Sequence, residues 1–152
     1  MLSHTADYAL RALLVLGRNY GQRSVRADEV ADATGTPRNY TAKVLNGLAK
    51  AGVVSSLRGP SGGFALLQPP NSISLASIID LFDEPHQHTK CLLGIRPCTP
   101  SEPCAAHHTW TAVMRARREP LTTITLGDLL GSEPAAFAES AGAPDAGAVA
   151  TI

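Results

Sequence analysis

Residues 36–66 read TPRNYTAKVLNGLAKAGVVSSLRGPSGGFAL, and this stretch decides the fold. Its first half spaces apolar residues as on one face of a helix, with Thr36 as the expected N-cap and Pro37 at the first helical position. Its second half places two strand-like segments, 53–57 and 64–67, on either side of a glycine-rich loop, which predicts a β-hairpin. A helix followed by a hairpin is the second half of a winged helix-turn-helix.

The preceding residues supply the other two helices of such a module. Apolar residues at helical spacing predict a helix over about 4–20, capped by Ser3 or Thr5, and a short helix over 27–34. The order of helix, short helix, turn, helix and hairpin therefore predicts a mainly α fold with a small β-hairpin wing.

Three further helices are predicted after the hairpin. Ser74 is expected to cap a short apolar helix that includes Phe82. A longer helix is expected over 105–119, with Pro120 ending it. Thr125 is expected to cap a last short helix over 126–130. From Ser132 onward the chain is rich in Ala, Gly and Pro, which predicts a disordered tail.

Composition excludes several classes of protein. The 152 residues contain 13 basic and 13 acidic side chains, so binding through bulk positive charge is excluded. Residues 1–70 nevertheless carry eight basic and four acidic residues, which favours a polyanionic partner for that half. No apolar run approaches the ~20 residues of a membrane span, and no secretory signal is visible. We expect a cytoplasmic protein with no membrane partner.

The predicted third helix and the hairpin loop have the residue types of a DNA-reading surface. Asn and Arg side chains bond adenine and guanine edges in the major groove, and Lys holds phosphate. Glycines let a loop approach the duplex closely, so that one Arg can enter the minor groove. The predicted contacts are Arg38, Asn39, Tyr40, Ala42, Lys43 and Asn46 on the helix and Arg58, Gly59, Ser61 and Gly62 in the loop.

A cysteine-rich stretch follows at 91–107, which reads CLLGIRPCTPSEPCAAH. Three thiolates and an imidazole on a proline-stiffened loop can close a tetrahedral site for zinc or for the iron of an iron–sulfur cluster. Spacing alone does not separate these metals, and a metal-free thiol redox switch is a third interpretation. An enzyme using a Cys–His pair is disfavoured, because no orienting third group is recognisable. The predicted ligands are Cys91, Cys98, Cys104 and His107.

Together these segments resemble the Rrf2 family of bacterial winged-helix regulators, over about residues 1–131. The loop RGPSGG combined with the downstream cysteine trio is the most specific part of the resemblance. The matching pieces are DYALRALL at 7–14, PRNY at 37–40, LAKAGVVSSLRGPSGGFAL at 48–66, ISLASIID at 73–80, CAAHHTW at 104–110 and ITLGDLL at 124–130.

The resemblance implies a symmetric homodimer, joined through the long helix after the cysteine loop, that binds a palindromic operator in double-stranded DNA. It also implies an iron–sulfur cluster, [2Fe-2S] in preference to [4Fe-4S], whose state alters DNA binding. His107 matches the fourth ligand of the cluster-assembly regulators, and Asp7 matches the carboxylate that nitric-oxide-sensor-like members supply across the dimer. Ala42 stands where the assembly regulators have a specificity-setting Glu, so their operator preference does not transfer.

The expected organisation has three parts. Residues 1–70 form the DNA-binding module, residues 71–131 form the linker helix, the cysteine loop and the dimerisation helix, and residues 132–152 form the tail. The expected function is a non-enzymatic transcriptional regulator, with a repressor as the working assignment, that senses redox state, nitric oxide or iron. The alternatives are a regulator with structural zinc, a metal-free thiol switch, and a protein-binding adaptor that does not bind DNA.

Overall fold

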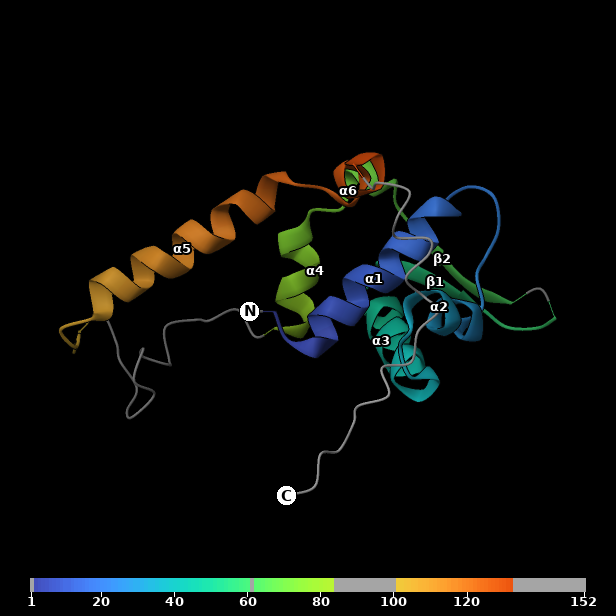
Figure 1. Cartoon of the computed structure of the whole chain (residues 1–152), viewed down its shortest axis with the longest axis horizontal. Helices are drawn as coiled ribbons and strands as arrows, with labels where there is room; N and C mark the ends of the chain where they lie inside the picture. The colour runs from blue at the N-terminus through green and yellow to red at the C-terminus, as the bar shows by residue number, and fades with distance from the viewer. Residues whose placement is uncertain (1, 61, 84–100, 133–152) are drawn as a thin grey trace, which may run out of the picture.

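The computed structural model describes residues 2–60, 62–83 and 101–132. Residues 91–100 of the predicted cysteine-rich stretch (91–107) and residues 133–152 of the predicted tail (132–152) lie outside these ranges. Ser132 is described and is helical, so the tail prediction begins one residue too early. Figure 1 shows a cluster of helices and one hairpin, from which a single long helix projects. The elements are α1 (His4–Arg18), α2 (Ala27–Thr34), α3 (Arg38–Lys50), β1 (Val54–Leu57), β2 (Gly63–Leu66), η1 (Pro70–Ser72), α4 (Leu75–Phe82), α5 (His107–Thr123) and α6 (Leu126–Ser132).

The first three helices and the hairpin form the predicted winged helix-turn-helix. Ser3 caps α1 as predicted, with its hydroxyl accepting the Ala6 N–H at 3.1 Å. The α2 helix ends at Thr34 and is capped by Gly35, whose left-handed φ of 66° lets the chain turn toward α3. The prediction for Thr36 is wrong, because Pro37 is the N-cap residue of α3. Thr36 is instead buried, and its hydroxyl accepts from the Thr34 hydroxyl at 2.9 Å.

One hydrophobic core contains residues from the helices that precede the hairpin in sequence and from those that follow it. The centre is formed by α1 and α3, whose Leu13 and Leu45 are fully buried. Ile78 of α4 and Leu126 of α6 belong to the same core, although they follow the hairpin in sequence. Phe82, the last residue of α4, lies against α3, because a Cβ built on Gly47 would be 3.1 Å from its ring. The second half of the chain therefore supports the position of α3 directly.

The wing is fastened to the helices at its base. The two strands pair antiparallel from Val54 opposite Leu66 to Leu57 opposite Gly63, one residue away from the predicted bounds. Val25, in the link between α1 and α2, exchanges two backbone hydrogen bonds with Phe64, at 2.9 and 2.8 Å. The hairpin thus gains a third extended segment, which fixes its orientation relative to α1.

The α5 helix runs longer than predicted. Pro120 does not end it, and the helix continues to Thr123. Proline removes one hydrogen bond from a helix interior and leaves a carbonyl in the preceding turn without its donor. Ala116, the residue four positions earlier, is exposed, so that water can satisfy its carbonyl. No helix within the described ranges has the length and apolar character required to cross a membrane.

A capping box begins α6, as the sequence predicts for Thr125. The Asp128 N–H donates to the Thr125 hydroxyl at 3.2 Å, and the Thr125 N–H donates to the Asp128 carboxylate at 2.8 Å. The bond from the Thr125 hydroxyl, followed by the bond from its N–H, lowers the pKa of Asp128. The ionised carboxylate therefore stabilises the folded state above its unfolded pKa, and this contribution is lost as the pH falls through the lowered folded pKa.

We expect Asp128→Ala to lower the melting temperature at pH 7, with a difference from the wild type that shrinks as the pH falls below about 4. Thermal unfolding followed by circular dichroism between pH 2 and pH 7 measures this difference. Glu119→Ala is the control, since Glu119 is an exposed acid whose side chain makes no hydrogen bond or ion pair within the described residues. A difference that stays constant with pH would contradict the assigned role of Asp128.

Candidate nucleic-acid interface and cysteine-bearing helix

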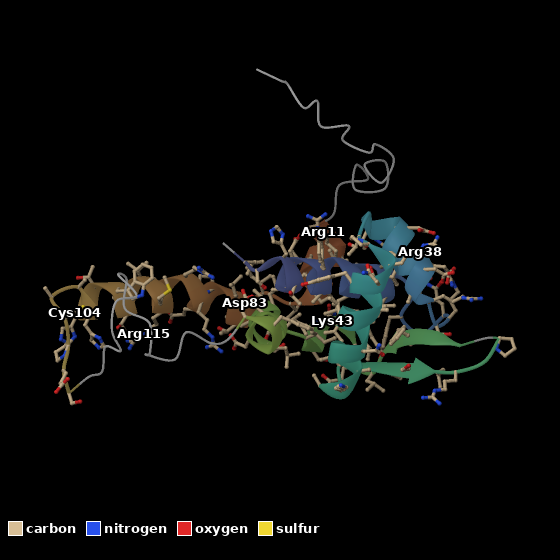
Figure 2. The ribbon with its side chains drawn as sticks, turned by 90° about the horizontal axis from the view of Figure 1, so that it is seen from below. Arg11, Arg38, Lys43, Asp83, Cys104 and Arg115 are labelled. Atoms are coloured by element: carbon tan, nitrogen blue, oxygen red, sulfur yellow. The ribbon has the colours of Figure 1, made fainter. Side chains whose placement is uncertain are left out.

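The α3 helix divides into a buried face and an exposed polar face, as its sequence predicts. Val44, Leu45 and Leu48 point into the core. Four of the predicted DNA contacts are exposed on the other face, and Figure 2 shows two of them, Arg38 and Lys43, along α3. These four are Arg38, Asn39, Lys43 and Asn46, whereas Ala42 is half-buried.

Tyr40 has a second role that the sequence does not reveal. Its hydroxyl lies 2.9 Å from the Thr5 hydroxyl, and its ring packs edge-on against Tyr8 with centroids 5.5 Å apart. Both partners belong to the first part of α1. The Lys43 Nζ lies 6.0 Å from the centroid of the Tyr40 ring, at the limit of a cation–π contact. Tyr40 therefore fastens the start of α3 to α1.

Ion pairs neutralise part of the positive charge of residues 1–70, which we call the head. The Arg23 Nη1 lies 3.1 Å from the Glu29 carboxylate, and the Arg38 Nη2 lies 3.1 Å from the Asp32 carboxylate. The bond from the Arg26 N–H, ahead of the bond from Arg23, lowers the pKa of Glu29, so this carboxylate is charged at neutral pH. Three basic residues of the head make no ion pair within the described residues, and they are Lys43, Lys50 and Arg58.

The wing tip is a tight turn that depends on glycine. Gly59 has a left-handed φ of 109°, and its carbonyl accepts the Gly62 N–H at 2.9 Å. A Cβ on Gly62 would lie 2.5 Å from the Leu57 carbonyl oxygen, which is backbone and cannot move aside cheaply. Arg58 is exposed within this turn, and Ser61 lies outside the described residues. Gly62 therefore shapes the loop that presents Arg58.

We expect Gly62→Ala to distort the wing and to weaken DNA binding about tenfold, the usual effect of losing one arginine contact. Fluorescence anisotropy with a labelled duplex measures the affinity, and circular dichroism checks that the helices remain. Gly131→Ala is the matched control, because a Cβ there meets no atom within 4 Å. Equal affinity of both variants and the wild type would show that the wing conformation does not matter.

The cysteine end, by which we mean Cys104 and the start of α5, lies far from the head (Figure 2). Cys104 precedes α5, and the His107 N–H donates to the Cys104 carbonyl at 3.0 Å in a hydrogen-bonded turn. Figure 2 shows Cys104 and Arg38 at opposite ends of the molecule. Cys91 and Cys98 lie outside the described ranges, so the structure does not test whether the four predicted ligands meet. Within those ranges no three His, Cys, Asp or Glu side chains gather as a metal site.

The alternative ligand Asp7 lies on α1 and already has a partner. The Arg11 Nη2 is 3.0 Å from the Asp7 carboxylate, and both side chains are partly exposed. Arg11 and Cys104 lie in different parts of the molecule (Figure 2), so Asp7 and Cys104 of one chain do not come together. A ligand set that includes Asp7 therefore needs a second copy of the chain.

The projecting α5 helix buries none of its residues in the chain. Val113 is 49% exposed, and Trp110, Met114 and Leu121 are half-buried on the same side of the helix. Leu81 of α4 adds another exposed apolar side chain. An Arg118–Asp80 ion pair connects α5 to α4. This arrangement leaves an apolar helix face that the described part of the chain does not cover.

Comparisons with known proteins agree with this architecture. The Rrf2 family model, described as an iron-dependent transcriptional regulator, matches residues 2–132. An Aquifex aeolicus protein named as an HTH-type transcriptional regulator is 36% identical over 135 residues, which cover 88% of this chain and 93% of the relative. The HTH-type transcriptional regulator IscR of Vibrio campbellii is 31% identical over 129 residues, covering 85% and 76%. The solved oxidised form of Staphylococcus aureus CymR has a TM-score of 0.72 at 25% identity, covering 88% of this chain and 98% of CymR.

Proposed function

Because this chain belongs to the Rrf2 family of transcriptional regulators, we propose that it binds a palindromic operator as a homodimer whose affinity is set by an iron–sulfur cluster. The chain is a regulator and not an enzyme. The observation that carries the proposal is that one chain combines an exposed, polar α3 face with a cysteine that directly precedes the projecting helix α5. Such a regulator would act in the cytoplasm, where its DNA lies.

The proposed DNA interface consists of the exposed face of α3 and the wing tip. The Lys43 and Arg58 side chains carry positive charge that no carboxylate neutralises within the described residues, so they are suited to phosphate or minor-groove contacts. Asn39 bonds the Tyr40 N–H through its amide oxygen at 3.0 Å, which leaves its amide nitrogen to donate. The predicted set from Arg38 to Gly62 remains the proposed contact surface.

The proposed dimer interface is the apolar side of α5. A helix with no buried residue in its own chain is unstable alone, because burial of an apolar face supplies most helix stability in proteins. A second copy would cover Trp110, Val113 and Met114 through a two-fold contact. Residues 71–131 would then serve assembly and sensing, while residues 1–70 bind DNA.

The donor chemistry of the cysteine end fits an iron–sulfur cluster. Cys104 is half-buried, and its carbonyl accepts the His107 N–H, so one thiol and one imidazole belong to the same backbone turn at the start of α5. Cys91 and Cys98 would complete the ligand set, with Asp7 of a second copy as the alternative to His107. A [2Fe-2S] cluster would supply one-electron chemistry and sites that oxidants and nitric oxide can attack.

The proposed control of DNA binding is a linkage between two dimer geometries. A two-fold dimer must hold its two copies of α3 about one DNA turn, ~34 Å, apart to fit a palindrome. A cluster that binds one geometry more tightly favours that geometry by its difference in binding energy. The long α5 connects the cysteine end to the interface and to α4, which packs against α3 through Phe82.

A thiol switch is the second candidate function, favoured by the similarity to CymR in an oxidised form. In this case Cys104 and another cysteine would change the dimer geometry through oxidation, without metal. A structural zinc ion on the same ligands would stabilise the loop without sensing. These alternatives differ from a cluster in colour, in iron content and in acid-labile sulfide.

Anaerobic purification is the experiment that tests the proposed function. We expect a coloured protein with iron and sulfide, which selects an operator from a random pool of duplexes and binds it with a different affinity from its metal-free form. Equal affinity of the two forms would contradict cluster control. Zinc in place of iron would favour the structural-metal alternative, and a colourless protein whose affinity follows reductant would favour the thiol switch.

A further inference from the structure

We propose that Asp32 is a specificity-determining positioning residue, which holds Arg38 in the orientation that reads a guanine. The inference rests on the proposed binding of DNA through α3. It adds a residue of α2 to the recognition surface, although sequence reasoning placed no DNA-binding role on α2.

The geometry joins the two helices of the helix-turn-helix across their turn. A single nitrogen of Arg38, Nη2, donates to both oxygens of the Asp32 carboxylate, at 3.2 and 3.1 Å. The backbone between them is fixed, since Gly35 adopts a left-handed conformation and Thr36 is buried. The backbone position of Arg38 is therefore defined, and its guanidinium is held by Asp32.

Neither charge stands where a helix alone would favour it. Arg38 is the first residue of α3, where the helix dipole disfavours a cation, and Asp32 lies in the last turn of α2, where it disfavours an anion. The pair is also 69% and 65% exposed, and exposed pairs add little to stability. Helix stability therefore gives no reason for these two charges, and their exposure leaves them accessible to a DNA partner.

The chemistry of the guanidinium suits such a role. Arginine has five donor hydrogens in a planar fork, and Asp32 bonds only through Nη2. Nη1 and Nε make no hydrogen bond among the described residues. Each of them shares with Nη2, which has two hydrogens, one edge that can donate two parallel bonds, so the edge that does not face Asp32 remains to meet guanine O6 and N7. A phosphate brought to the same place would face the Asp32 carboxylate at close range. Asp32 therefore favours a base edge over the backbone as the partner of Arg38.

The test measures base preference, because loss of an Asp32–Arg38 pair that only stabilised the fold would leave the base preference unchanged. The wild type, Asp32→Asn and Asp28→Asn each select from a pool of random duplexes, and sequencing gives the preference at each position. Asp28→Asn is the matched control, because it removes the same charge from the same helix where Asp28 pairs with Arg26 at 3.5 Å. Circular dichroism confirms that each variant folds.

We expect Asp32→Asn alone to lose about tenfold of guanine preference at one position of each half-site. We also expect its affinity for duplexes of unrelated sequence to rise, since Arg38 is released to phosphates. Arg38→Lys should lose the same guanine position, because Lys lacks the planar fork.

Two outcomes would overturn the inference. One is a base preference of Asp32→Asn equal to that of Asp28→Asn, and the other is a lost position that Arg38→Lys leaves intact. Both are distinguishable from failure of the proposed function, in which the wild type itself selects no sequence.

Discussion

Replacing Val113 by Asp is expected to leave a folded monomer that binds its operator at least a hundredfold more weakly. Val113 is half exposed on a helix that contributes no residue to the core of the described part of the chain. In a two-fold interface the variant places two carboxylates in one apolar contact, where burying an unpaired charge is costly. Without the dimer each half-site is bound alone, and the gain of roughly 10²–10⁴ from bivalent binding is lost.

Sedimentation velocity measures the loss of the dimer, and fluorescence anisotropy with the selected operator measures the affinity. Ala112→Asp is the matched control, because Ala112 is exposed on the opposite side of α5. A Val113→Asp variant that remains a dimer would refute the interface on this helix face. A monomer that keeps full operator affinity would refute the requirement for two copies.

The second large effect is expected for Cys104→Ser, which should abolish the iron and the visible absorption of the anaerobic protein. The serine hydroxyl is nearly the same size, but it is not a soft thiolate ligand. Allosteric couplings typically change affinity by about 5–150-fold, and the variant should show the operator affinity of the metal-free wild type. Retention of a full complement of iron by this variant would remove Cys104 from the ligand set.

Single substitutions identify the fourth ligand of the cluster when the iron content and visible absorption of each anaerobic variant are measured. His107→Ala is expected to lower the cluster content, whereas His108→Ala, one residue further along α5, is expected to leave it unchanged. Asp7→Ala is expected to be without effect on the spectrum. The reverse pattern, with loss in Asp7→Ala alone, would assign the fourth ligand to α1.

The sequence was sufficient for the winged helix-turn-helix because its signals are local. The buried face of α3 follows helical spacing, Gly35 marks the turn, and the glycine-rich loop between two apolar segments marks the wing. Ser3, Ser74 and Thr125 cap their helices as predicted, since a cap depends on residues three positions apart. The expectation of a mainly α fold with a β-hairpin wing is confirmed.

The incorrect and missing predictions concern features that depend on contacts between residues distant in sequence or on exposure to solvent. Pro120 remains inside α5 because Ala116, four residues earlier, is exposed and water can satisfy its carbonyl, and periodicity does not show this exposure. The contact of Tyr40 with Thr5 joins residues 35 positions apart, and no local pattern indicates it. Asp32 and Arg38 are closer in sequence, but they meet only because the turn between their helices is folded. The meeting of Cys91 and Cys98 with Cys104 stays a prediction.

The two hydrogen bonds between Val25 and Phe64 have a consequence for how a dimer would respond to a signal. They attach the wing to the link between α1 and α2, and α1 packs against α3 in the core. We therefore expect the hairpin and α3 to shift together rather than separately. Each copy would then meet the duplex as an unchanging shape. A signal would alter the distance between the two copies, and the spacer between operator half-sites would be the DNA feature most sensitive to it.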